Sequence, residues 1–298
     1  MKKIIYMLVL VITSCSTLKK ESPLSQQEVE SKSLKFPKAL VSSINNGAVK
    51  KVQLIYPFQK IKAKLFCAGH EVALGSPKDG VANVYISSSR HKETGSFWCE
   101  YRFTINKIEK KVAVAKFNII DSNYPLRTLT VAKKYAKLSD QAIERWKKET
   151  AHMDLVYAAA ITDRALFTKP FVKPLNSKIT AVYGSKRVFN DMKHSWHSGV
   201  DFRARPGTKI PAANRGRVVL ARDHFFTGKT VIIDHGMGIM TMYCHLSEFK
   251  VGEGDIVPQR AIIALSGNTG RSSGPHLHWG VRVNDHWING FSLLSEGI

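Results

Sequence analysis

The sequence predicts a mainly β protein in which a small N-terminal β-sandwich, a connecting helix and a C-terminal β domain follow one another. Short β-prone runs separated by turn signals recur through most of the chain. Residues 139–160 instead carry apolar side chains at helical spacing. The roughly 250 residues behind the N-terminal segment suit two domains of modest size.

The first residues have the composition of an export signal. Two lysines precede an apolar run, residues 4–13, that is too short to span a bilayer. The run ends in Ile12-Thr13-Ser14-Cys15, which resembles the lipobox of bacterial lipoproteins. We therefore predict a lipoprotein signal peptide over residues 1–14 and a lipid anchor on Cys15. An ordinary signal peptide with an unrelated cysteine is the alternative, and both would export the chain.

Residues 15–47 are rich in Ser, Lys and Glu, which predicts a flexible tether. Residues 48–135 predict the N-terminal β-sandwich-like domain, in which we find no catalytic constellation. Its two cysteines, Cys67 and Cys99, can form a disulfide in an oxidising compartment, and two unpaired core thiols are the alternative. The β-prone runs of this domain are residues 51–58, 63–67, 81–87, 95–108, 111–117 and 127–131.

A helical linker is predicted over residues 136–170. Ser139 or Asp140 can cap its helix. One stripe of the helix is mostly apolar, which is typical of a packing face, and consists of Ile143, Trp146, Thr150 and Met153.

The C-terminal domain is predicted over residues 171–298, with β-prone runs at 215–223, 229–234, 238–246, 262–266 and 276–284. Strict alternation over the third run predicts two faces. One face would hold Met240, Met242, Cys244 and Leu246, and the other Ile239, Thr241, Tyr243 and His245. Cys244 is then expected to be a buried, inert thiol. His245 is expected at the strand end, on the less apolar face.

The last run carries the motif His276-Leu277-His278. Because side chains alternate along a strand, both imidazoles lie on one face, roughly 6–7 Å apart. The opposite face, which includes Leu277 and Trp279, is apolar and is expected to pack on a core.

A second pair of candidate ligands lies upstream. His197 and Asp201 are four residues apart, with Gly199 between them, and both are Zn²⁺ ligand types. Together with the H-x-H pair they supply three protein ligands and one spare imidazole. Catalytic zinc sites keep three protein ligands and an open fourth position, so this count favours a catalytic site over a structural one.

These motifs resemble the lysostaphin-type, or LytM-type, zinc metalloendopeptidases. The resemblance begins near Pro174, and the upstream β domain and helix resemble less specifically the N-terminal half of envelope lipoprotein members. Arg260 and Asp191 stand where the family often has glycine, which affects the expected loop shapes and not the proposed ligands. The matching segments are His197-Ser198-Gly199-Val200-Asp201-Phe202, Ile233-Asp234-His235-Gly236, Tyr243-Cys244-His245-Leu246-Ser247, Gly252-x-Gly254-Asp255 and Gly267-Asn268-Thr269-Gly270 through Pro275-His276-Leu277-His278-Trp279-Gly280.

The resemblance implies a C-terminal antiparallel β-sheet peptidase domain that binds Zn²⁺ through His197, Asp201 and His278. His276 would lie beside the metal-bound water that acts as nucleophile, and His245 would lie across the site. The implied activity is hydrolysis of peptide bonds in peptidoglycan, with the D-alanine–diaminopimelate cross-bridge favoured and pentaglycine as the lesser option. His235 is expected to be a turn or supporting residue and not a ligand.

The implied protein is a monomer, exported and lipid-anchored in the cell envelope, in the periplasm at the outer membrane. A net charge of +22 favours anionic partners. The sequence leaves two other functions open: a non-catalytic relative that binds cell wall, and a basic nucleic-acid binder. The export signal and the lack of aromatic–basic clusters argue against nucleic acid.

Overall fold

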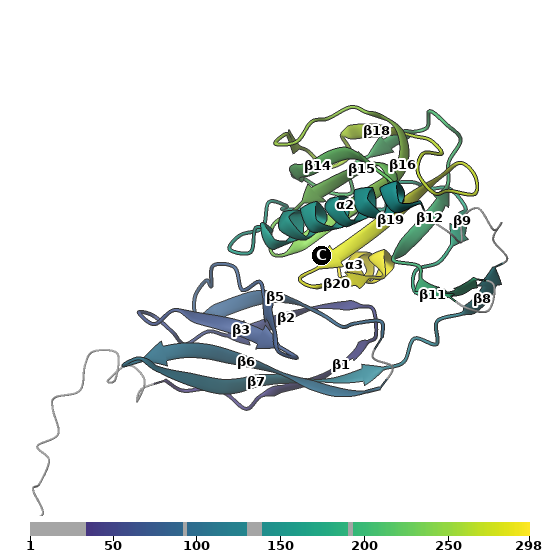
Figure 1. The fold of residues 1–298 in the computed structure, drawn as a ribbon. Helices are drawn as coiled ribbons and strands as arrows, with labels where there is room; N and C mark the ends of the chain where they lie inside the picture. Colours follow the sequence, from purple (N-terminus) through teal and green to yellow (C-terminus); the bar gives the residue numbers. More distant parts are fainter. Residues whose placement is uncertain (1–33, 92–93, 130–138, 190–192) are drawn as a thin grey trace, which may run out of the picture.

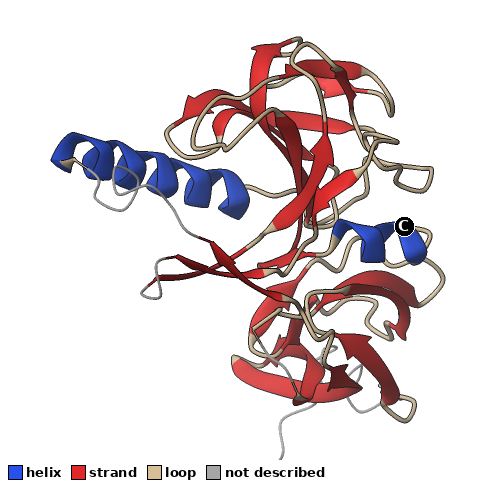
Figure 2. Cartoon of the chain, turned by 90° about the vertical axis from the view of Figure 1, so that its right-hand side faces the viewer, coloured by secondary structure: helices blue, strands red, loops and turns tan. Residues whose placement is uncertain are grey.

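The computed structural model describes residues 34–91, 94–129, 139–189 and 193–298 (Figure 1). The predicted signal peptide, its Cys15 and residues 15–33 of the expected tether lie outside the described residues. The chain is mainly β, as predicted, with small N-terminal sheets, one long helix and a large antiparallel sheet (Figures 1 and 2). Neither helix in the described ranges has the length and apolarity needed to cross a membrane.

The N-terminal part is a five-stranded sheet, in the order β1-β7-β6-β3-β4, that packs on a two-stranded ribbon of β2 and β5. Alternating burial along β6, where every second residue from Phe97 to Ile105 is buried, turns one face of the sheet toward the ribbon. The strands are β1 (Leu40–Asn45), β2 (Val49–Ile55), β3 (Ala63–Cys67), β4 (His70–Val72), β5 (Val81–Ser87), β6 (Gly95–Ile105) and β7 (Ile108–Ile120).

Strand β1 falls inside the segment that we expected to be a tether. It pairs in parallel with β7, from Leu40 opposite Ala115 to Asn45 opposite Ile120. Its sequence, Leu-Val-Ser-Ser-Ile-Asn, has no clear alternation, and only Ile44 is buried. The strand therefore depends on hydrogen bonds to a partner 75 residues away in the chain, which local sequence does not reveal.

Cys67 and Cys99 form a disulfide, as predicted. The two residues are direct partners on the antiparallel pair β3 and β6, and their Cα atoms are 4.1 Å apart. Both side chains are buried in the N-terminal core. The alternative of two unpaired thiols is therefore wrong. Cys244 is a free, buried cysteine, and burial raises the pKa of its thiol to about 12.

Helix α2 (Asp140–Ala158) begins after Ser139, whose side chain accepts a hydrogen bond from the Ala142 amide. The predicted stripe is only partly the packing face. Met153 packs on the large sheet, but Trp146 is 45 % exposed and meets the Phe226 ring in a T-shaped contact. The other packing residues lie nearer the C-terminal end and include Val156 and Tyr157. The helix therefore covers part of one sheet face in addition to linking the two β parts.

The C-terminal part is built around a ten-stranded antiparallel sheet whose main path is β17-β14-β15-β16-β19-β12-β9. Strands β8 (Leu126–Leu129), β10 (Lys186–Phe189) and β11 (Lys193–Trp196) form a separate small sheet, and α3 (Gly290–Ser295) follows the last strand. The large sheet comprises β9 (Ile179–Ala181), β12 (Gly199–Arg203), β13 (Lys209–Pro211), β14 (Gly216–His224), β15 (Gly228–Asp234), β16 (Ile239–Phe249), β17 (Ile256–Val257), β18 (Ile262–Ser266), β19 (His276–Val283) and β20 (His286–Ile288).

The two parts meet through the β2–β5 ribbon and the end of the chain. Val49 and Tyr85 belong to the same hydrophobic cluster as Trp279, on the sheet face away from His276 and His278. The Asn289 amide donates to the Gly47 carbonyl at 2.7 Å. This contact therefore uses the face opposite the one that carries the candidate ligands.

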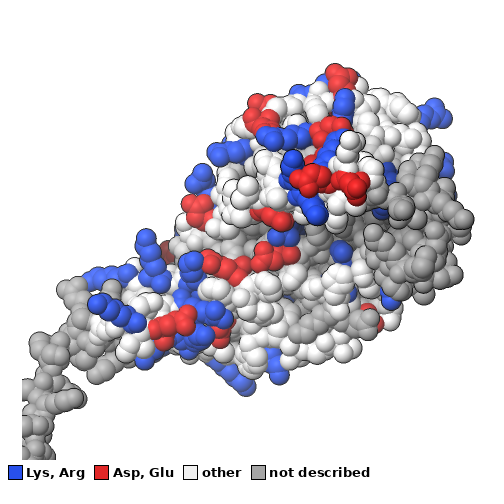
Figure 3. Space-filling view, viewed as in Figure 1, with Lys and Arg blue, Asp and Glu red and all other residues white. Residues whose placement is uncertain are grey.

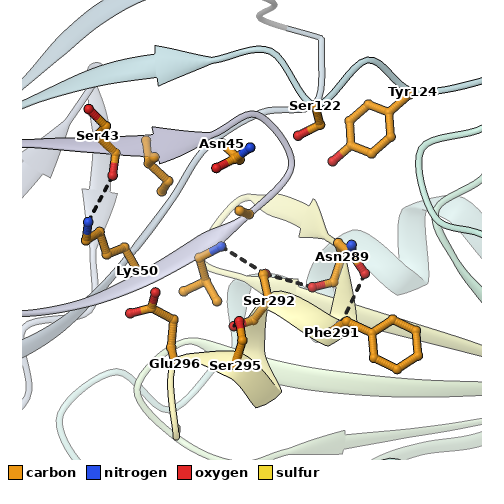
Figure 4. A pocket seen from close by; sticks show the side chains of 13 residues that line it. Ser43, Asn45, Lys50, Ser122, Tyr124, Asn289, Phe291, Ser292, Ser295 and Glu296 are labelled. Atoms are coloured by element: carbon orange, nitrogen blue, oxygen red, sulfur yellow. Dashed lines mark hydrogen bonds between the residues drawn. The ribbon is translucent and has the colours of Figure 1, made fainter.

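On the face shown in Figure 3, Lys and Arg side chains are spread over both β parts, with Asp and Glu among them. A pocket of about 460 Å³ lies at the seam between the two parts, and Lys50, Tyr124, Asn289 and Glu296 are among the residues that line it (Figure 4). Several of its polar groups bind one another: the Lys50 ammonium donates to the Ser43 carbonyl, and the Val49 amide donates to the Ser292 hydroxyl. The pocket thus serves mainly to join the two parts.

Candidate metal centre

Strand β19 has the two faces that its sequence predicts. Leu277, Trp279, Val281 and Val283 are fully buried in the main hydrophobic cluster. His276 and His278 therefore point to the other face of the sheet. The apolar residues fix the strand in the core, and the histidines are held in place as a consequence.

Strand β12 brings Asp201 beside these histidines. It lies beside β19 (Figure 1) and pairs with it in antiparallel register, with Asp201 opposite His278. His197 lies just before the strand. A Cβ atom on Gly199 would lie 2.4 Å from the Trp279 carbonyl oxygen and 2.8 Å from the His278 ring. Glycine between the two ligands is therefore required for the close approach of the strands.

The three predicted ligands converge. His197 Nε2 lies 2.9 Å from Asp201 Oδ1, His278 Nδ1 lies 2.8 Å from the same oxygen, and the two nitrogens are 3.1 Å apart. Ligand atoms bound tetrahedrally at about 2.0–2.1 Å from zinc would be roughly 3.3–3.4 Å apart. Two imidazole nitrogens and one carboxylate oxygen, all buried, are a donor set that fits Zn²⁺.

The protonation of these groups also suits a cation. Burial acts to raise the pKa of Asp201, but interactions with His197 and His278 outweigh it and hold the pKa well below its ordinary value. Burial lowers the pKa of His278, which favours the neutral imidazole that binds metal. His197 Nδ1 lies 2.8 Å from the Val182 carbonyl and must donate to it, which leaves the lone pair on Nε2, toward the cluster.

His245 and His276 face each other beside the three ligands. Their ring centroids are 4.7 Å apart, and His276 Nε2 lies 3.7 Å from Asp201 Oδ1. His245 Nδ1 donates to the Thr269 carbonyl and His276 Nδ1 to the Gly274 carbonyl. Both rings therefore keep a lone pair on Nε2. Burial lowers the pKa of His245 to about 4, so this imidazole is neutral near pH 7.

The position of His245 depends on an irregularity in β16. Pairing with β15 steps from Val231 opposite Tyr243 to Lys229 opposite Leu246, so the β16 strand has one extra residue there. His245 itself has a φ of +60°. The bulge brings His245 to the histidine face, so its expected position on the face of Ile239, Thr241 and Tyr243 is wrong.

The same bulge also makes the predicted position of Leu246 wrong. Leu246 was expected on the face of Met240, Met242 and Cys244, but it packs with Tyr243 in the main hydrophobic cluster. Met240, Met242 and Cys244 do share a face, beneath α2, as predicted. One inserted residue reverses the side of every residue that follows.

The carbonyl groups of Val182, Thr269 and Gly274 orient the imidazoles, and sequence reasoning missed all three. Backbone acceptors carry no side-chain signature. The Gly-rich segment 267–274 before the H-x-H motif is the signal that could have indicated two of them.

His235 is a buried supporting residue. Its Nδ1 donates to the Arg215 carbonyl at 2.9 Å, its Nε2 lies 2.7 Å from Thr241 Oγ1, and its ring packs on Phe171. It is fully buried and lies outside the group of candidate ligands. Burial lowers its pKa to about 4.

This pKa predicts acid-sensitive stability. Between about pH 6.5 and pH 4 the unfolded chain protonates His235 and the folded chain does not, so stability falls as the pH drops through that window. The loss from this one residue is on the order of 3 kcal/mol. It can be measured by urea unfolding at pH 7, 6, 5 and 4 with a chelator present, so that metal release does not contribute. His235→Gln should flatten this slope and His70→Gln, at an exposed site, should not; equal slopes in all three proteins would contradict the assignment.

Residues 195–290 match the model of a family described as Peptidase family M23. Peptidoglycan DD-endopeptidase ShyA of Vibrio cholerae serotype O1 is 43 % identical over 93 residues, which are 31 % of this chain and 22 % of that protein. DD-carboxypeptidase/endopeptidase Mpg of Neisseria meningitidis serogroup B is 34 % identical over 125 residues, 41 % of this chain and 28 % of that protein. The chain thus matches only about a quarter of the length of these relatives.

The fold has a solved counterpart. A crystal structure from Pseudomonas aeruginosa, assigned to the M23 peptidases, superposes with a TM-score of 0.62 at 23 % identity. It covers 88 % of this chain and 97 % of its own. The likeness therefore includes the N-terminal β part, and it concerns the fold alone.

Proposed function

This chain belongs to peptidase family M23, and from that premise we propose that it is a zinc endopeptidase that hydrolyses peptide bonds of peptidoglycan. The observation that carries the proposal is the convergence of His197, Asp201 and His278 beside a facing pair of imidazoles. Two curated relatives whose names include peptidoglycan DD-endopeptidase or DD-carboxypeptidase/endopeptidase support the substrate class.

We assign the metal to His197, Asp201 and His278. When bound, zinc supplies a Lewis acid that polarises a carbonyl group and lowers the pKa of a water molecule toward neutrality. The chain then has to hold the peptide, remove a proton from the attacking water and deliver a proton to the leaving amine.

The two remaining histidines, His245 and His276, can carry out these proton transfers. His276 Nε2 has a free lone pair close to the ligand cluster and is the proposed base. His245 lies across from it, within reach of the same space. The neutral His245 ring can accept on Nε2 a proton that the attacking water loses, and because burial holds its pKa near 4 the resulting imidazolium gives that proton readily to the leaving nitrogen.

The finer proposal is that the D-alanine–diaminopimelate cross-bridge is cut, with pentaglycine as the alternative substrate. Incubating the purified chain with cross-linked peptidoglycan and identifying the new termini by mass spectrometry tests both. New D-alanine carboxyl ends paired with free diaminopimelate amines support the proposal. Intact cross-bridges after digestion, with the protein loaded with zinc, would overturn it.

A non-catalytic wall-binding relative is the second candidate. Such a protein would have lost a ligand or one of the facing histidines, whereas all five residues are present and grouped here. A nucleic-acid binder has less support, because the basic residues on the face of Figure 3 are interspersed with acidic ones.

We also propose that the protein is exported and anchored to the envelope through a lipid on Cys15, as a monomer that reaches peptidoglycan by its tether. The wild-type protein should then enter the detergent phase of a detergent extraction. Cys15→Ala should leave an unlipidated precursor or a soluble product, and Cys244→Ala should partition like the wild type. Wild-type protein in the aqueous phase would refute the anchor.

A further inference from the structure

One cation lies next to the proposed catalytic pair. Val200 and Phe202 of β12 are buried in the main hydrophobic cluster, so Asp201 and Arg203 point to the opposite, histidine-bearing face. Arg203 is directly opposite His276 in the pairing of β12 with β19. Directly opposed side chains on one sheet face have Cβ atoms about 4.5–5.5 Å apart.

The guanidinium of Arg203 is available to a ligand. Its side chain is exposed, and it has no ion pair or side-chain hydrogen bond within the residues that the structure describes. Arg282, on the same face of β19, is different: it lies over the Tyr157 ring and pairs with Asp285. Arg203 is thus a positively charged side chain beside the proposed catalytic histidines, and it takes part in no ion pair with the other described residues.

The proposed substrate offers a matching anion. In a D-alanyl–diaminopimelate cross-bridge, the carbon that carries the scissile nitrogen also carries a free carboxylate. Arg203 lies two residues from Asp201, roughly 6–7 Å along the strand, so an extended arginine side chain spans the distance to such a group. A guanidinium binds a carboxylate through two parallel hydrogen bonds, and an oligoglycine bridge has no carboxylate at this place.

We propose that Arg203 binds the free carboxylate next to the scissile amide and so selects diaminopimelate cross-bridges over glycine bridges. This inference rests on the proposed peptidoglycan endopeptidase function. Arg203 is a residue for substrate selection: it contacts the substrate but takes no part in proton transfer.

The test compares two cross-linked muropeptide dimers that differ only in this carboxylate, which is free in one and amidated in the other. Wild-type protein should cleave the free form with a kcat/KM roughly 10- to 100-fold higher, mainly through a lower KM. Arg203→Ala should lose this preference by losing activity on the free form only. Arg203→Lys, which keeps a point charge without the planar fork, should restore part of it.

Arg217→Ala is the matched control, because Arg217 is exposed on β14, three strands from β19. It should keep the wild-type preference, and all variants should retain zinc and the wild-type unfolding midpoint. An equal preference in the wild type and Arg203→Ala would overturn the role of Arg203 while leaving the proposed function intact. No cleavage of either dimer by zinc-loaded wild type would overturn the proposed function and this inference with it.

Discussion

His278→Ala is expected to lose zinc, whereas His276→Ala is expected to keep it and lose roughly 10²–10⁴-fold in rate. The two residues share one face of β19, but only His278 Nδ1 lies within 3.1 Å of both His197 Nε2 and Asp201 Oδ1. Removal of His278 leaves two protein ligands. Removal of His276 leaves the ligand set whole and takes away a proton acceptor.

The other members of the cluster extend this comparison. His197→Ala should behave like His278→Ala, and His245→Ala like His276→Ala. Metal analysis after dialysis against a modest chelator concentration, together with rates of peptidoglycan digestion, separates the two classes. If the zinc were structural, loss of a ligand would unfold the protein. No variant would then combine an impaired rate with a normal zinc content.

Two results would refute this division of roles. One is that His276→Ala loses zinc as readily as His278→Ala. The other is that His276→Ala digests peptidoglycan at the wild-type rate. His235→Gln serves as a control for general damage, because His235 is buried but lies outside the ligand cluster, and it should retain zinc.

Replacing Cys67 and Cys99 together by alanine is expected to lower the free energy of unfolding by about 4 kcal/mol in the chain-entropy description. The disulfide joins residues 32 positions apart, so it restricts a loop of moderate length in the unfolded chain. In the folded chain the two residues are already held as direct partners of β3 and β6. The lower free energy of unfolding should therefore come mainly from a higher conformational entropy of the unfolded chain.

Urea unfolding followed by tryptophan fluorescence measures this loss, and Trp98, next to Cys99, lies in the affected strand. Cys244→Ala in both backgrounds removes any contribution from the free thiol. Reductant should shift the wild-type unfolding midpoint and leave the double variant unchanged. Free-thiol labelling at both positions of the folded, unreduced wild type would show that the bond does not form.

Much of the candidate site could be predicted from local sequence. The alternation of apolar and histidine residues from His276 to Val283 was enough to place two imidazoles on one face, and the structure confirms it. The close approach that Gly199 permits explains why a glycine separates His197 from Asp201. Each of these features acts within a few residues, where the period of the strand is reliable.

Features that depend on distant partners could not be predicted in this way. Strand β1 has no alternation of its own and exists through its register with β7. The packing face of α2 depends on which residues of the large sheet lie beneath Met153 and Tyr157. The predicted stripe was therefore only partly correct. The bulge at His245 arises where β16 meets β15, and it cannot be read from the residues of β16 alone.

Local sequence was thus enough to predict which residue types could bind a metal. It also predicted the common face of His276 and His278, because strand periodicity is a local property. The tertiary structure decided that His245 reaches them, through a bulge and a φ of +60° that alternation excludes. It also decided which carbonyl groups orient the imidazoles and that Arg203 stands opposite His276. These depend on the register between strands far apart in the chain, which packing of the whole core selects.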